Sequence, residues 1–161
     1  MAAVLGLEDA QIEEICAAAE GVVEAVNYNS PGQVVIAGHT AAVEATIEKL
    51  KEAGAKRAML LPVSAPFHTS LMRPAGEKLE QALAELTVNS PVIPVVHNVH
   101  AQTESDPAKI KALLTEQIYS AVKWVSCVEA MTEVGVECTL ECGPGKVLSG
   151  LNKRIQKSLT C

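Results

Sequence analysis

The sequence predicts an α/β protein in two parts: a strand–helix–strand–strand–helix–strand unit over residues 1–62, then a layered α/β part over residues 63–161. Three observations predict this class. Short apolar runs alternate with segments whose apolar residues recur every three to four positions, as in amphipathic helices. Turn residues such as Asn29-Ser-Pro-Gly32 separate these segments. Hydrophobic residues make up 48% of the chain and charged residues 20%, which is enough apolar material for a packed core.

The first unit is expected to hold four strands and two helices. In chain order these are the strand Ala2–Leu7, the helix Glu8–Ala19, the strands Val22–Asn27 and Gln33–Ala37, the helix Thr40–Ala53 and the strand Arg57–Val63. The first helix is indicated by Ile12, Ile15, Cys16 and Ala19, which share one helical face. The second has Val43, Ile47 and Leu50 on its inner face and stops at Gly54. This order is the split βαβ arrangement of a ferredoxin-like unit, so we expect a ferredoxin-like βαββαβ small subdomain over residues 1–62.

The second part is expected to continue with helices and strands in alternation. In chain order these are the helix Ser70–Leu86, the strand Ile93–Val99, a helix from Asp106-Pro107 to Tyr119, the helix Val125–Glu133, the strand Glu137–Glu141 and a final helix carrying Leu148, Leu151, Ile155 and Leu159. The nearly continuous apolar run Ile93–Val99 is typical of a strand covered on both faces. Such alternation indicates a layered, largely parallel α/β arrangement.

Composition argues against several functional classes. The formal charge of −6 does not suit a nucleic-acid-binding surface, and the basic pair Lys153-Arg154 lies where it complements the dipole at the end of the last helix. The apolar stretch before Glu8 is too short for a signal sequence or a membrane span. Five cysteines, with no Cys-x-x-Cys pair, indicate reduced thiols in a cytoplasmic protein and no zinc site.

One histidine, His68, stands where an extended segment meets a predicted helix, in Ser64-Ala-Pro-Phe-His-Thr-Ser-Leu-Met72. An imidazole is a general base near neutral pH. Pro66 and the following helix restrict the backbone on both sides, as a catalytic residue requires. The alternative is an ordinary solvated or core histidine. The chain has no Gly-x-Ser-x-Gly segment that would present a nucleophilic serine on a strand-to-helix turn.

A candidate partner for this imidazole is Gln117, which shares the apolar face of its predicted helix with Ile110 and Leu113. Its side-chain carbonyl could accept the Nδ1–H of an imidazole and fix the tautomer, the task that a carboxylate performs in other triads. The alternative is an ordinary glutamine at the boundary of the core.

Three other segments indicate structure rather than chemistry. Gly143-Pro-Gly-Lys-Val147 could cradle an anion before a helix, but it lacks the phosphate-loop spacing, and a structural turn is the simpler interpretation. Gly38-His-Thr-Ala-Ala42 lacks the serine and second glycine of a nucleophile elbow, so we interpret Thr40 as a helix N-cap. His97 and His100 are three apart in strand-like sequence and are expected to face opposite sides, which argues against a metal pair.

Several longer segments together resemble the malonyl-CoA:acyl carrier protein transacylase family, in its C-terminal portion. They are Met1-Ala-Ala-Val-Leu-Gly-Leu7, Asn27-Tyr-Asn-Ser-Pro-Gly-Gln-Val-Val-Ile-Ala-Gly38, Leu61-Pro-Val-Ser-Ala-Pro-Phe-His68, Gln117-Ile-Tyr-Ser-Ala-Val-Lys-Trp124 and Glu141-Cys-Gly-Pro-Gly-Lys-Val-Leu148. The order and spacing of these segments cover almost the whole chain.

The resemblance implies a ferredoxin-like subdomain followed by the C-terminal part of an α/β-hydrolase-like acyltransferase domain, with residues 63–161 forming the latter. It implies that His68 is the catalytic histidine, that Gln117 hydrogen-bonds to it, and that Phe67 contacts substrate. The implied reaction moves a malonyl group from malonyl-CoA to the phosphopantetheine thiol of acyl carrier protein in fatty-acid biosynthesis. It proceeds by a ping-pong mechanism through an acyl-serine and needs no further cofactor or metal.

The resemblance also implies that the serine, a carboxylate-binding arginine and the oxyanion donors lie before the position of Met1. We therefore expect a truncated gene product, a partial sequence or one piece of a split enzyme. The isolated chain should be inactive, because it lacks the nucleophile. It should also be poorly soluble, because apolar edges would be exposed. The alternative function is a non-enzymatic ferredoxin-like module that binds a protein or a small ligand.

Overall fold

A four-stranded antiparallel sheet organises the N-terminal part of the computed structural model, which describes residues 1–161. Its strands are β1 (Ala2–Leu5), β2 (Val23–Ser30), β3 (Gln33–Gly38) and β4 (Arg57–Leu60), in the spatial order β2-β3-β1-β4. β1 is central because it pairs with β3 on one side and β4 on the other, with Ala2 opposite both Ile36 and Leu60. The predicted chain order of strands and helices in this unit is confirmed.

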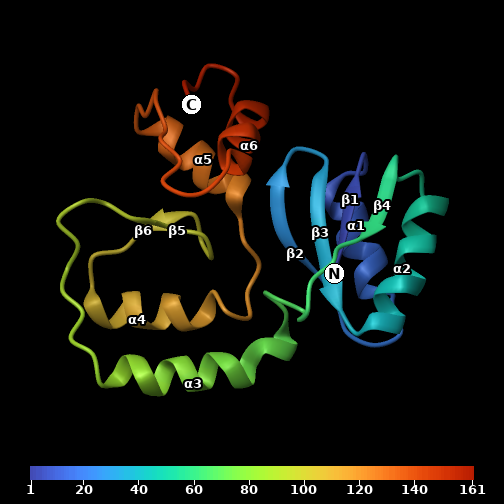
Figure 1. Ribbon diagram of the computed structural model, residues 1–161, viewed down its shortest axis with the longest axis horizontal. Helices are drawn as coiled ribbons and strands as arrows, with labels where there is room; N and C mark the ends of the chain where they lie inside the picture. The colour runs from blue at the N-terminus through green and yellow to red at the C-terminus, as the bar shows by residue number, and fades with distance from the viewer.

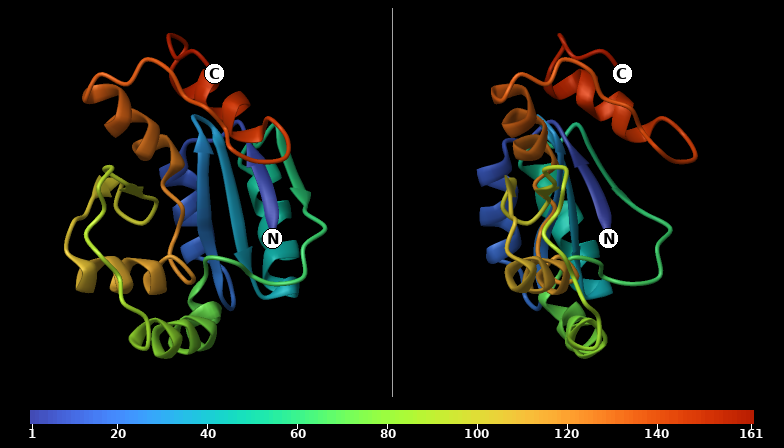
Figure 2. Two further views of the ribbon diagram at one scale, coloured as in Figure 1. Left: turned by 60° about the vertical axis from the view of Figure 1, so that its left-hand side comes forward. Right: turned by 90° about the vertical axis from the view of Figure 1, so that its left-hand side faces the viewer.

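Two helices, α1 (Asp9–Ala17) and α2 (Thr40–Glu52), cover one face of this sheet (Figures 1 and 2). The alternation of strand side chains divides β3 between two cores: Val34 and Ile36 face the helices, whereas Val35 and Ala37 belong to a smaller cluster on the opposite face. Ile12, Val43 and Leu50 are almost fully buried in the larger core. Burying each such side chain contributes about 1.5–3 kcal/mol, so this core accounts for much of the stability of the unit.

The C-terminal part is mainly helical. It comprises a 3₁₀ turn η1 (Ser70–Met72), the helices α3 (Arg73–Ala84), α4 (Pro107–Glu116), α5 (Trp124–Glu133) and α6 (Val147–Ile155), and the two-residue strands β5 (Val96–His97) and β6 (Gln102–Thr103). α3 and α4 run side by side, as Figure 1 shows. The segment before α5 joins the outer edge of β2, where Tyr28 donates its N–H to the Val122 carbonyl and Val122 donates to that of Val26.

The strand predicted over Ile93–Val99 is wrong in extent and in burial. Only Val96–His97 is a strand, and it pairs in antiparallel fashion with β6. Val92 and Ile93 are 99% and 76% exposed, so no layer covers them within this chain. Pro91 and Pro94 flank these residues and have no backbone N–H, which explains why no regular ladder forms on this segment.

The predicted strand Glu137–Glu141 and the predicted parallel sheet are also wrong for this chain. Cys138 forms one isolated parallel bridge with Thr160, and Leu140 is 86% exposed. The only other parallel pairing is a single bridge between Asn27 and Val122. A strand needs a neighbour along its length to form a ladder, and neither apolar segment has one here.

Smaller differences concern where elements begin and end. The helix predicted from Ser70 divides into η1 and α3, and the final helix stops at Ile155, leaving Leu159 buried beyond it. The N-cap of α2 is His39, not Thr40, which is its first helical residue. Lys153 and Arg154 do lie in the last turn of α6, as predicted. None of the helices combines the length and apolar character that crossing a membrane requires.

Candidate active site

His68 lies in the loop that leads from β4 to η1, and its backbone is in the left-handed region with φ 64°. Residues other than glycine rarely adopt this conformation, because Cβ then crowds the backbone. Such a conformation persists only where its surroundings hold it. Contacts with surrounding residues therefore hold His68 in this conformation, and one of them is made by its ring.

The imidazole of His68 meets Gln117, with 2.8 Å between Nδ1 and the main-chain oxygen of Gln117. The residue predicted as the partner is present, but the predicted atom is wrong, since the accepting oxygen is not that of the side-chain amide. Gln117 is the C-cap of α4, and carbonyls in the last turn of a helix have no partner within the helix. Because a carbonyl can only accept, Nδ1 donates its hydrogen, and in the neutral imidazole Nε2 is then the acceptor.

The loop around His68 is also held by its own residues. Thr69 is fully buried, and its hydroxyl donates to the Pro66 carbonyl over 2.6 Å. Met72 donates its backbone N–H to the Thr69 carbonyl over 2.9 Å. Phe67 directly precedes the histidine and is 41% exposed, so its ring is accessible to a ligand.

A close packing contact joins α3, which follows the loop, to the segment after α4, which follows Gln117. A Cβ placed on Gly76 would come within 2.8 Å of the Tyr119 ring, so only glycine permits this approach. The Arg73 guanidinium lies 4.6 Å from the centroid of the same ring, a cation–π geometry. Sequence reasoning missed Arg73, Gly76 and Tyr119, because these contacts join residues far apart in the chain.

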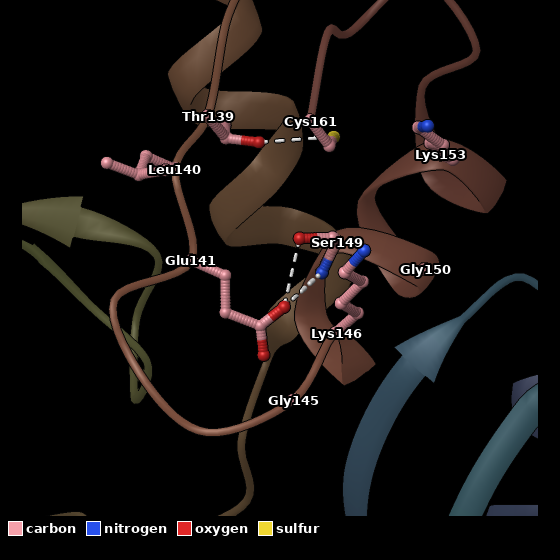
Figure 3. Close-up of a pocket in the computed structure, with 9 residues that line it drawn as sticks. All are labelled: Thr139, Leu140, Glu141, Gly145, Lys146, Ser149, Gly150, Lys153 and Cys161. Carbon is pink, nitrogen blue, oxygen red and sulfur yellow. Dashed lines mark hydrogen bonds between the residues drawn. The ribbon is translucent and has the colours of Figure 1, made fainter.

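The Gly143–Val147 loop is a structural turn before α6, as the simpler interpretation predicted. The Glu141 carboxylate accepts the backbone N–H groups of Leu148 and Ser149 and the Ser149 hydroxyl. The hydrogen bond from the Ser149 backbone lowers the pKa of Glu141. The N-terminus of α6 is thus already occupied by a carboxylate of the chain itself. Beside it lies a pocket of about 430 Å³, which His68 does not line (Figure 3).

The other two candidate histidines, His97 and His100, lie against each other, which contradicts the prediction that they face opposite sides. Their ring centroids are 5.8 Å apart with an interplanar angle of 79°. The strand ends at His97, and the chain turns back through Ala101, whose φ is 58°. No group of three or more His, Cys, Asp or Glu side chains in the structure is arranged to hold a metal ion.

The fold is that of an acyltransferase domain. Residues 1–157 match the family model described as the acyl transferase domain, and the chain belongs to this family. The mixed α/β architecture likewise matches solved acyltransferase structures.

Among individual proteins, the chain is 54% identical over 162 residues to the malonyl CoA-acyl carrier protein transacylase of Escherichia coli strain K12, covering 99% of this chain and 52% of that protein. A crystal structure of the acyl-carrier-protein S-malonyltransferase of Burkholderia pseudomallei 1710b superposes with a TM-score of 0.96 at 53% identity, covering 99% of this chain and 52% of that one.

A third relative is a malonyl-transacylase in complex with a type II polyketide synthase acyl-carrier protein. It is 44% identical to this chain with a TM-score of 0.96, and the match covers 99% of this chain and 52% of that one. The chain thus spans about half the length of the relatives it matches.

Proposed function

We propose that this chain is the C-terminal part of a malonyl transacylase and supplies its catalytic histidine. The reaction moves a malonyl group from malonyl-CoA to the phosphopantetheine thiol of acyl carrier protein, in fatty-acid biosynthesis. The main support for this proposal is the 2.8 Å contact between His68 and Gln117. The chain that contains it is 54% identical, along 99% of its length, to a malonyl CoA-acyl carrier protein transacylase. Five free cysteines suit the reducing environment of the cytoplasm.

In this proposal Nε2 of His68 takes the proton of a serine hydroxyl as its oxygen attacks the malonyl thioester. The Nδ1–H bond to the Gln117 carbonyl keeps the ring in the required tautomer. Collapse of the tetrahedral intermediate breaks the C–S bond, and the imidazolium returns its proton to the CoA thiolate. The carrier thiol then attacks the acyl-serine by the same proton transfers in reverse roles. Phe67, exposed beside the histidine, contacts the acyl group.

The serine must come from a second segment, because the chain has no Gly-x-Ser-x-Gly sequence. Exposed apolar residues support a missing neighbour: Val92, Ile93, Leu140 and Val147 are each more than 70% exposed. Exposed apolar surface of this kind favours contact with another segment.

We further propose that residues 1–62 form a ferredoxin-like subdomain and residues 63–161 the C-terminal part of the α/β-hydrolase-like domain. The strand order β2-β3-β1-β4, with both helices on one face, supports the first assignment. The mainly helical second part, with unpaired apolar segments, supports the second.

The test is reconstitution. The chain is co-expressed with a polypeptide that carries a Gly-His-Ser-x-Gly segment from the N-terminal half of a related transacylase, and malonyl transfer from malonyl-CoA to carrier protein is measured. We expect no transfer by either piece alone and transfer by the complex. His68→Ala in the complex should lower kcat by about a thousandfold or more, whereas His39→Ala, at the N-cap of α2, should not. Transfer by the isolated chain, or an active His68→Ala complex, would overturn the proposal.

A further inference from the structure

The loop that carries His68 donates hydrogen bonds to distant parts of the chain at two points. Among residues 64–72, His68 bonds to Gln117 and Ser70 bonds to Glu24, whereas the bonds of Thr69 and Met72 join residues close in sequence. The first contact comes from α4 and acts on the ring. The second comes from β2, in the N-terminal sheet, and acts on the backbone two residues beyond the histidine.

The contact between Glu24 and Ser70 uses every available donor of Ser70. The Ser70 backbone N–H lies 3.3 Å from Oε1 and 3.1 Å from Oε2 of Glu24, and the Ser70 hydroxyl also donates to Oε1. Hydrogen bonds to an ionised acceptor are stronger than neutral ones, and two donors on one carboxylate restrict orientation as well as distance. Glu24 is only partly exposed, which limits competition from water.

The strand that bears Glu24 is irregular immediately after it. Glu24 pairs with Ala37 of β3, and the register shifts between Ala25 and Asn27. A β-bulge re-aims the neighbouring side chains and bends the strand. Here the result is a carboxylate that projects from the N-terminal sheet toward the loop, 46 residues further along the chain.

We propose that Glu24 is a positioning residue for His68: its carboxylate holds Ser70 and thereby stabilises the left-handed backbone that presents the imidazole to Gln117. The catalytic consequence rests on the proposed function, but the geometric claim does not. Without Glu24, the hydrogen bonds that still hold the backbone around His68 are those to Gln117 and those made by Thr69 within the loop. The loop then relaxes toward ordinary backbone angles, and the bond from Nδ1 loosens.

The first experiment reads the ring directly in the isolated chain. Histidine side chains are labelled with ¹⁵N, and the tautomer of His68 and the hydrogen exchange of the Ser70 amide are measured by NMR. Wild type should show hydrogen on Nδ1 only. Glu24→Ala should mix the two tautomers and speed exchange of the Ser70 amide by about tenfold or more. Glu24→Gln keeps one accepting oxygen and should restore part of the tautomer preference of His68 and part of the protection of the Ser70 amide.

Two further variants separate positioning from general stability. Ser70→Ala removes the hydroxyl but keeps the backbone donor, so it should fall between wild type and Glu24→Ala. Glu44→Ala removes an exposed carboxylate of α2 that makes no hydrogen bond, and should match wild type. Thermal unfolding of each variant identifies any that fails to fold. If Glu24→Ala does not fold, Glu24→Gln and Ser70→Ala still test whether Glu24 positions His68. A wild-type tautomer and amide exchange in a folded Glu24 variant would overturn the inference.

The second experiment uses the reconstituted complex. Glu24→Ala should lower kcat by about tenfold or more with little change in the KM for malonyl-CoA, because the carboxylate touches the loop and not the substrate. An inactive wild-type complex would contradict the proposed function, and the NMR result would still decide the role of Glu24. An active complex in which Glu24→Ala leaves kcat unchanged would contradict the positioning role.

Discussion

His68 donates its Nδ1 hydrogen to the main-chain carbonyl of Gln117, over 2.8 Å, and not to the amide of that side chain. A main-chain acceptor survives replacement of the side chain. Gln117→Ala should therefore keep the His68 tautomer and change kcat/KM of the reconstituted complex by less than about threefold. A loss of a hundredfold or more would show that the amide itself acts. His68→Ala is the matched control for loss of function.

Two glycines should respond in opposite directions to replacement by alanine. A Cβ on Gly38 would lie 1.8 Å from the Val22 carbonyl oxygen, so Gly38→Ala must displace the backbone of β2 or β3. We expect it to lower the free energy of unfolding by about 2 kcal/mol or more. Gly150 is within α6 and has open space around its Cβ position, so Gly150→Ala should raise that free energy by about 0.5–1 kcal/mol. Urea denaturation measures the free energy of unfolding of both variants. Equal changes in the two would contradict the difference in space around Gly38 and Gly150.

The five cysteines should fall into two reactivity classes. Cys16 and Cys127 are buried, and burial raises the pKa of Cys16 to about 11 and also raises that of Cys127. Cys138, Cys142 and Cys161 are exposed. Since the thiolate is the reactive species, a thiol reagent at about pH 8 should label these three rapidly and the buried pair only after denaturation. Mass spectrometry identifies the sites, and rapid labelling of Cys16 in the folded chain would contradict its burial.

Acidification should destabilise the chain partly through His97. Burial lowers the pKa of this imidazole, the nearby His100 lowers it further, and Glu104 acts in the opposite direction. Because the pKa of His97 in the folded state is below its ordinary value of 6.5, the unfolded state binds the proton first as the pH falls. The free energy of unfolding therefore decreases as the pH falls below 6.5. The free energy of unfolding should drop less steeply between about pH 7 and about pH 5 in His97→Gln than in wild type. Parallel slopes would contradict this assignment.

The sequence determined the elements of the first unit because each depends on local patterns. The short apolar strand predicted over Gln33–Ala37 and the helix predicted from the spacing of Val43, Ile47 and Leu50 appear in the structure with boundaries shifted by at most a few residues. The second part could be predicted less well. Helices such as α5 and α6 have a periodicity of their own, whereas a strand is completed by a neighbouring strand. Residues 92–95 and Leu140 have no such neighbour in this chain.

The residues of the candidate site were likewise only partly predictable from the sequence. Its histidine and its glutamine were both identifiable, from the restricted backbone around His68 and from the family resemblance near Gln117. The accepting atom was not, because it depends on α4 ending at Glu116 and freeing the next carbonyl. Glu24 carried no local signal, since its partner lies 46 residues away. Only the packing of α3, α4 and the sheet around the loop decided these contacts, because hydrogen-bond geometry depends on positions in space and not on spacing along the chain.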